Sequence, residues 1–261
     1  MPNCISVHGI QIPLYTPPLT NGTAEWNITY TCDLACITCQ KLSFLPAKTR
    51  DMTERDATDF INQCVARNWK PRIILIGGEP TLHKDVFQFI EIAHRFNPGH
   101  VEIWSNGYSN RAKRVLQRIQ SDGKCCVRKE GWKTSSIVHS ITDYFLAPVD
   151  FGETRKPCGV HSSNGGCGIS VDSEGYTICP IGGTIASWLK LPIKTKVLND
   201  LFDPVFALNQ TTELCKYCGC FMGVTSKKLT AAHLIRGTLM SKTWVNAVQN
   251  QLRSDSLPRK R

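Results

Sequence analysis

Residues 72–80 read RIILIGGEP, and this stretch decides the fold. Its first half is rich in β-branched residues and stops at Gly77 and Gly78, which is typical of a short buried strand that ends in a turn. Helical spacing of apolar residues occurs on both sides of the strand, at 53–68 and 85–96. A buried strand between two helices is the repeating unit of a parallel α/β sheet.

The same alternation of strand and helix continues in both directions along the chain. Strands are expected at 25–31, 101–104 and 143–149, and a further helix at 110–120. Parallel sheets place their chemistry in the loops at the carboxyl ends of the strands. The conspicuous motifs of this chain directly follow expected strands, so a functional site is predicted at that edge of the sheet.

The composition is that of an ordinary globular protein, since 41% of the 261 residues are hydrophobic and 20% are charged. No apolar run approaches the roughly 20 residues that a membrane-spanning helix needs, and the N-terminus does not resemble a signal peptide. A cytoplasmic protein is therefore predicted. The formal charge is +10. Residues 227–261 hold eight basic residues against one acid, and this basic tail suggests an anionic partner.

Thirteen cysteines are many for a reducing compartment, where metal or cluster ligation is a better explanation than disulfides. Three of them form the run Cys32-Asp-Leu-Ala-Cys36-Ile-Thr-Cys39, directly after the expected strand at 25–31. Three thiolates at this spacing can hold a [4Fe–4S] cluster and leave one iron without a protein ligand. A zinc knuckle that lacks its fourth ligand is the alternative. Four separate cysteines are expected to be buried or incidental thiols: Cys4, Cys64, Cys125 and Cys126.

A second cysteine set lies in a glycine-rich region where no helix is expected. Residues 168–177 are predicted to form a hairpin that turns at Asp172–Gly175. The set can hold a second cluster or a structural zinc ion. The sequence leaves open which four of its six members bind: Cys158, Cys167, Cys179, Cys215, Cys218 and Cys220.

The cysteine run and the GGEP turn one βα unit later together resemble the radical SAM superfamily. Ser105-Asn106-Gly107 is similar to a third turn found in many members. The resemblance covers residues 23–150 and implies a partial (β/α)6 barrel, a TIM-like α/β fold. It implies a catalytic [4Fe–4S] cluster on Cys32, Cys36 and Cys39. It further implies that one group of residues binds S-adenosylmethionine, namely Gly77, Gly78, Glu79, Pro80, Ser105 and Asn106. Glycine fits this role because it allows a close backbone approach to the cofactor.

The second cysteine set resembles the SPASM or twitch extensions of the same superfamily, although its spacing is shorter. The resemblance implies an auxiliary [4Fe–4S] cluster on Cys167, Cys179, Cys215 and Cys218, with Cys158 as the first substitute. Four segments are predicted on this basis: an N-terminal arm at 1–22, the partial barrel at 23–150, a cysteine-rich twitch-like module at 151–225, and a basic amphipathic helix and tail at 226–261.

The activity implied by the resemblance is reductive cleavage of S-adenosylmethionine by an oxidoreductase or isomerase. The resulting 5′-deoxyadenosyl radical would abstract a substrate hydrogen, with electrons supplied by a flavodoxin or ferredoxin. A peptide substrate is the leading hypothesis, because twitch-type modules often accompany peptide maturation. A small metabolite is one alternative, and a nucleotide or nucleic-acid base, suggested by the basic tail and Trp244, is another. A non-catalytic metal-binding nucleic-acid protein is disfavoured, because such a protein does not need a GGEP turn on a long parallel barrel.

Overall fold

The structure is a computed structural model that describes residues 4–7, 10–13, 22–36, 39–43, 50–129, 168–219 and 241–256. The strand expected at 143–149 lies outside these residues, as do Cys158, Cys167 and Cys220.

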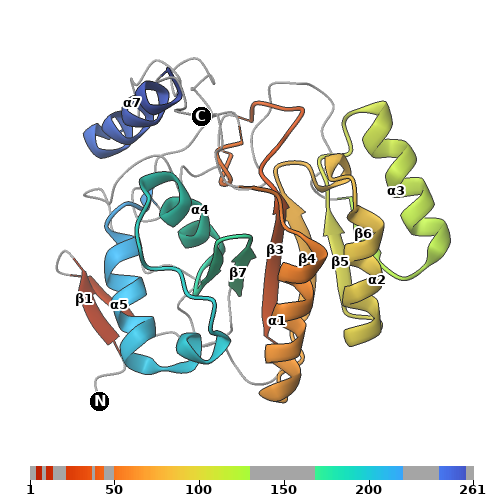
Figure 1. The fold of residues 1–261 in the computed structure, drawn as a ribbon, viewed down its shortest axis with the longest axis horizontal. Helices are drawn as coiled ribbons and strands as arrows, with labels where there is room; N and C mark the ends of the chain where they lie inside the picture. The colour runs from red at the N-terminus through yellow and green to blue at the C-terminus, as the bar shows by residue number, and fades with distance from the viewer. Residues whose placement is uncertain are drawn as a thin grey trace, which may run out of the picture.

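A six-stranded sheet occupies the centre of the molecule, in the order β6-β5-β4-β3-β7-β8 (Figure 1). Its strands are β3 (Thr23–Thr29), β4 (Arg72–Gly77), β5 (Val101–Trp104), β6 (Cys126–Arg128), β7 (Ile169–Asp172) and β8 (Gly175–Thr177). All neighbouring strands run parallel except β7 and β8, which form an antiparallel hairpin. The prediction of an α/β fold with a mostly parallel sheet is confirmed.

Three helices connect the parallel strands in the predicted order: α1 (Glu54–Ala66), α2 (Val86–Phe96) and α3 (Asn110–Asp122). Thr53 starts α1 with a capping box, in which the Thr53 side chain and Asp56 bond to each other's backbone N–H groups. Gly123 ends α3 in the left-handed conformation, with φ +72°, which glycine adopts without strain. A short 3-10 turn, η1 (Pro80–Leu82), follows the GGEP turn.

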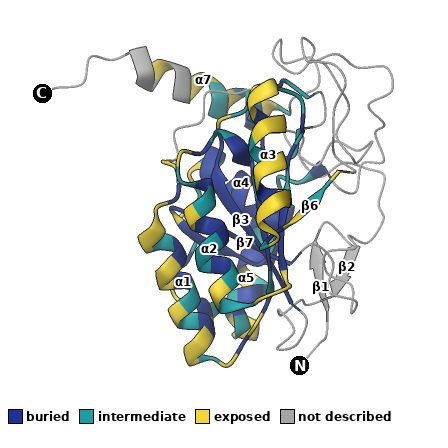
Figure 2. Cartoon of the chain, turned by 90° about the vertical axis from the view of Figure 1, so that its right-hand side faces the viewer, coloured by how far each residue is buried: buried dark blue, intermediate teal, exposed yellow. Residues whose placement is uncertain are grey.

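The apolar core lies between one face of the sheet and these helices (Figure 2). Trp26 on β3 is fully buried and meets Phe60 of α1 and Phe89 of α2 edge to face. Alternation along β3 turns Glu25 and Asn27 to the opposite face, yet both are also buried. One face of β3 is therefore apolar and the other is polar without being exposed.

The hairpin predicted at 168–177 is present, with its turn at Asp172–Gly175, but it belongs to the main sheet. Strand β7 pairs in parallel with β3, so the hairpin extends the main sheet. The expectation that helices are absent from this region is wrong, because α4 (Pro180–Leu189), η3 (Leu198–Phe202) and α5 (Pro204–Cys215) follow it. Prolines at the first position of α4 and of α5 cost no hydrogen bond there, which is why they begin helices instead of preventing them.

The two ends of the chain add separate elements. Strands β1 (Cys4–Val7) and β2 (Ile10–Pro13) pair as a two-stranded antiparallel sheet within the predicted arm. Near the C-terminus, α7 (Lys242–Ser256) packs against α4 through Trp244, which is fully buried. In the described part of the chain, no helix combines the length and apolar character needed to span a membrane.

Candidate functional site

The cysteine run forms a loop that begins where β3 ends, at the carboxyl edge of the sheet. Leu34 anchors the loop in the interior, while Cys32, Cys36 and Cys39 remain half-buried. The Cys39 N–H donates to the Cys36 carbonyl at 3.2 Å, and the Leu42 N–H donates to the Cys39 carbonyl at 3.2 Å. These turns keep all three thiols on one short segment beside the strand ends.

The chemistry of this loop fits an iron–sulfur cluster. Burial raises the pKa of the Cys32 thiol to about 12. Soft thiolates without a partner repel one another, and a bound metal removes that repulsion. Among the described residues no three Cys, His, Asp or Glu side chains converge as a ready-made metal site. Cluster binding would therefore have to draw the three thiols together.

The GGEP turn packs directly against the strand that carries the cysteine loop. The Gly78 N–H donates to the Thr29 carbonyl, and the Glu79 N–H donates to the Thr31 carbonyl, each at 2.8 Å. Gly77 has φ +148°, and a β-carbon there would meet the Thr29 carbonyl. At Gly78 a β-carbon would lie 2.6 Å from the carbonyl carbon of Thr31. The two glycines are thus required for the contact between neighbouring strand ends.

Glu79 links the GGEP turn to the turn that follows β5. Its side chain is fully buried, and burial raises its pKa although several donors oppose that shift. Oε1 accepts from the Ser105 hydroxyl at 2.8 Å and from the Thr81 N–H at 3.0 Å. Oε2 accepts from the Asn106 N–H at 2.8 Å. One buried carboxylate thus fixes two loops relative to each other.

Asn106 extends this network to the cysteine loop. Its side-chain amide donates to Asp33 at 2.8 Å and approaches the Cys32 sulfur at 3.8 Å. The side-chain Oδ1 of Asn106 accepts from the Tyr108 N–H, which fixes the orientation of the side-chain amide. The three motifs, far apart in the sequence, therefore meet at one edge of the sheet.

A model of the Radical SAM superfamily matches residues 26–127, which contain all three motifs. This part of the chain is therefore similar to the radical SAM superfamily. A segment of 63 residues is 38% identical to the AdoMet-dependent heme synthase of Methanosarcina barkeri, but it covers only 24% of this chain and 18% of that protein. A crystal structure of BtrN in an open conformation aligns with a TM-score of 0.44 and 12% identity, over 86% of this chain and 97% of that one.

The structure brings the predicted cofactor residues together around Glu79. Two contributors were not predicted, Thr81 and Asp33. Asp33 contacts Asn106 across two loops, which no local pattern reveals, whereas Thr81 bonds to Glu79 within one turn, where Glu79 caps η1. His83, close behind GGEP, is buried, receives the Asp85 N–H on Nδ1 and contacts the Met52 carbonyl through Nε2. Both ring nitrogens are used within the protein, which indicates a structural role for this histidine.

Two of the predicted ligands of the second cysteine set, Cys179 and Cys218, pack on a second apolar cluster, formed by Leu42, Ile181, Ile185, Ala186, Trp188, Leu214 and Trp244. Cys179 caps α4 and its sulfur accepts the Gly182 N–H at 3.5 Å. Cys215 ends α5, and the Cys218 N–H donates to the Cys215 carbonyl at 3.4 Å in the following turn. The fourth predicted ligand, Cys167, lies outside the described residues, so the auxiliary cluster stays a prediction.

Trp244 does not have the surface position that the nucleic-acid hypothesis requires. Its ring is fully buried in the second apolar cluster, and its Nε1 donates to the Tyr217 carbonyl at 3.2 Å, inside the turn between Cys215 and Cys218. A buried ring cannot stack on a base. The nucleic-acid hypothesis then depends on the basic residues alone.

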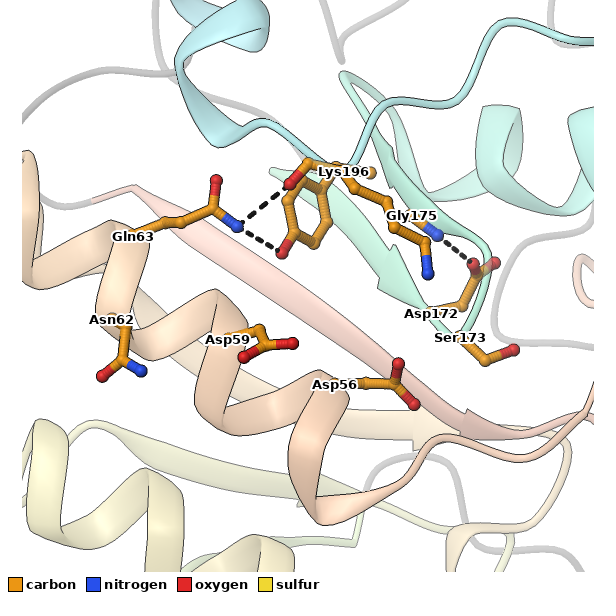
Figure 3. Close-up of a pocket in the computed structure, with 9 residues that line it drawn as sticks. Asp56, Asp59, Asn62, Gln63, Asp172, Ser173, Gly175 and Lys196 are labelled. Carbon is orange, nitrogen blue, oxygen red and sulfur yellow. Dashed lines mark hydrogen bonds between the residues drawn. The ribbon is translucent and has the colours of Figure 1, made fainter.

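A cavity of about 310 Å³ lies between α1 and the β7–β8 hairpin, away from the cofactor motifs (Figure 3). Its walls include Asp56, Asp59, Asp172 and Lys196. Gln63 bridges the Tyr176 hydroxyl and the Lys196 carbonyl, each at 3.0 Å. None of the GGEP residues lines this cavity, so it is not part of the cofactor site.

Proposed function

We propose that this protein is a cytoplasmic radical SAM enzyme that generates a 5′-deoxyadenosyl radical and abstracts a hydrogen atom from its substrate. The observation that carries the proposal is the Glu79 network, because it joins the GGEP turn, the Ser105-Asn106 turn and the cysteine loop at one strand edge. When bound, a reduced [4Fe–4S] cluster supplies the electron that breaks the carbon–sulfur bond of S-adenosylmethionine.

The protein's own residues would provide the binding frame for this chemistry. Cys32, Cys36 and Cys39 are the proposed ligands of the cluster, while the backbone at Gly77–Pro80 and the Ser105-Asn106 turn are proposed to hold S-adenosylmethionine. The partial burial of these three cysteines would limit the access of water and oxidants to a bound cluster. A preorganised frame keeps the cofactor in a fixed orientation, which is the main contribution a protein makes to such cofactors.

We further propose that Cys167, Cys179, Cys215 and Cys218 hold an auxiliary [4Fe–4S] cluster in a twitch-like module. Cys179 and Cys218 pack on the second apolar cluster, which supports this proposal. Leu42, three residues after Cys39, belongs to the same cluster. This places the two cysteine sets on elements that touch. A peptide is the substrate we propose to test first, with a flavodoxin or ferredoxin as the electron donor.

The test is anaerobic reconstitution of the full chain, followed by iron analysis and detection of 5′-deoxyadenosine under dithionite. About eight irons per chain are expected if each cysteine set holds one cube. Replacing Cys32, Cys36 and Cys39 together by alanine should remove about half of the iron and all 5′-deoxyadenosine. Continued formation of 5′-deoxyadenosine by the triple variant would show that the catalytic cluster is bound elsewhere.

The auxiliary site is tested separately by replacing Cys179 and Cys218 with alanine. This variant should lose the other half of the iron while the first cluster remains. If it retains the wild-type iron content, the second cysteine set holds no cluster. If it loses zinc instead, the module is a structural zinc site.

A further inference from the structure

The face of the sheet opposite α1 and α2 holds buried polar side chains beneath the cysteine loop. Glu25 and Asn27 are consecutive positions on this face of β3, and Ser170 lies opposite Glu25 on β7. Asn27 donates to the Ser170 hydroxyl at 2.9 Å. All three residues are at most 8% exposed, so their hydrogen-bonding groups are shielded from solvent.

Lys41 reaches this face from the cysteine loop, two residues behind Cys39. Its ammonium group lies 3.0 Å from Glu25 Oε2, and the two side chains are only 7% and 11% exposed. A lysine ammonium has three N–H donors, and the described residues account for one of them. The Lys41–Glu25 ion pair therefore has no net charge, and two N–H groups of Lys41 remain without an acceptor among the described residues.

Asn27 supplies the complementary feature, which is a buried acceptor without a donor. No described residue donates to its Oδ1, although the residue is 1% exposed. Asp172 on the same face is paired, because it accepts from the Tyr30 hydroxyl at 3.0 Å and from Lys194, whereas Thr184 Oγ1 on the covering helix α4 is also without a partner among the described residues. A buried polar atom without a partner is uncommon in proteins and costs stability unless a ligand or water completes it.

The net charge of Glu25, Lys41 and Asn27 indicates which net charge a ligand at this place would carry. One carboxylate, one ammonium and one amide sum to zero, so a net anion or cation would leave an uncompensated buried charge. A neutral carboxamide matches both free functions, because its carbonyl accepts from Lys41 and its N–H donates to Asn27. If the Asn27 amide is turned over, an N–H group becomes the free function, and the ligand carbonyl can accept from it.

We propose that Lys41, Glu25 and Asn27 form a binding site for a neutral amide group of the substrate, such as a peptide bond or a carboxamide. The inference rests on the proposed function and narrows its substrate class. The site lies on the polar face of the sheet that carries the cofactor motifs at its carboxyl edge. A bound amide would therefore lie on the same face of the sheet as Glu25, where Lys41 of the cysteine loop makes its ion pair.

The experiment uses ligand-observed saturation-transfer NMR on the anaerobically reconstituted full chain, with three small probes. N-acetylglycinamide represents the neutral amide, acetate the anion and methylammonium the cation. Saturation of N-acetylglycinamide is expected, with at least a fivefold loss in Asn27→Leu and no loss in Asn62→Leu, which changes an exposed asparagine on α1. Equal saturation in wild type and Asn27→Leu, stronger saturation of a charged probe, or no saturation of any probe would overturn the proposal.

A second variant covers the case in which Asn27→Leu does not fold. Glu25→Gln combined with Lys41→Met removes the buried ion pair without leaving a lone charge, and should also reduce N-acetylglycinamide saturation at least fivefold. Its matched control is Arg55→Met, which breaks the exposed Arg55–Asp59 pair. Unchanged saturation in the folded double variant would likewise overturn the proposal.

The same samples are assayed for 5′-deoxyadenosine, which separates this inference from the proposed function. A chain that binds the amide through Asn27 but forms no 5′-deoxyadenosine retains the binding site and refutes the radical chemistry. A chain that forms 5′-deoxyadenosine but shows no Asn27-dependent saturation refutes the binding site alone.

Discussion

Replacement of Glu79 by glutamine perturbs the group that joins the cofactor loops. Glutamine keeps the size of the side chain but has one acceptor oxygen where the carboxylate has two. If that oxygen takes the place of Oε1, the bonds from Thr81 and Ser105 survive, and the new NH₂ group faces the Asn106 N–H. The variant then loses one charge-assisted hydrogen bond and leaves a buried N–H without an acceptor.

The expected loss of stability follows from these two changes. A hydrogen bond to a charged group contributes about 1.5–3 kcal/mol, and an unsatisfied buried donor costs about 1–3 kcal/mol. Removal of a buried charge offsets part of this cost. We expect Glu79→Gln to lower the free energy of unfolding by about 2 kcal/mol, and Glu79→Ala by about 4 kcal/mol because all of its donors lose their acceptor.

The assay is urea unfolding of the metal-free chain at pH 7, followed by calorimetric titration of the reconstituted protein with S-adenosylmethionine. Glu54→Gln, an exposed acid in the first turn of α1, is the control and should change stability by less than about 0.5 kcal/mol. Glu79→Gln should also weaken S-adenosylmethionine binding, because the Asn106 turn loses its anchor. Stability and affinity both equal to those of the Glu54→Gln control would refute the role assigned to Glu79.

The pH dependence of the same pair of proteins gives an independent check. Burial raises the pKa of Glu79, so the native state binds a proton more readily than the unfolded state. The stability contribution of Glu79 therefore falls as pH rises from the ordinary glutamate pKa through the higher native value. Wild type should gain stability relative to Glu79→Gln as the pH is lowered into that window, and the opposite trend would contradict the assigned burial effect.

Two further predictions concern the glycine turn and the basic tail. Gly78→Ala should lower the free energy of unfolding by about 2–3 kcal/mol and reduce iron at the cysteine loop, because its β-carbon overlaps the backbone of Tyr30 and Thr31. Gly99→Ala is the control, because its φ of +79° is unfavourable for alanine but nothing lies within 4 Å of the added β-carbon. Equal losses of stability in both variants would show that the overlap at Gly78 is relieved. If the tail binds nucleic acid, gel-shift binding at low salt should disappear in a variant with glutamine at six positions, whereas unchanged binding would assign the tail to the solvated surface. The six positions are Lys227, Lys228, Arg253, Arg259, Lys260 and Arg261.

Elements with local signals were predictable from the sequence. The strands at 72–77 and 101–104 were predicted within a residue or two, because buried parallel strands leave short β-branched runs that end at turns. Thr53 and Asp56 mark the start of α1 through hydrogen bonds made within one turn. The sequence also predicted that the three motifs lie at the same edge of the sheet, because each motif directly follows a strand.

Only the tertiary structure decided how these pieces meet. The pairing of β3 with β7 joins segments more than a hundred residues apart, so the hairpin's place in the main sheet could not be inferred from its own pattern. Gly78 shows the difference at a single residue: the sequence assigns it to cofactor contact, whereas the structure places the strand-end backbone where its β-carbon would be. Trp244 likewise suggested an exposed stacking surface and is buried. Burial, buried ion pairs and hydrogen bonds between loops arise from the packing of distant segments, and periodicity along the chain carries no information about such contacts.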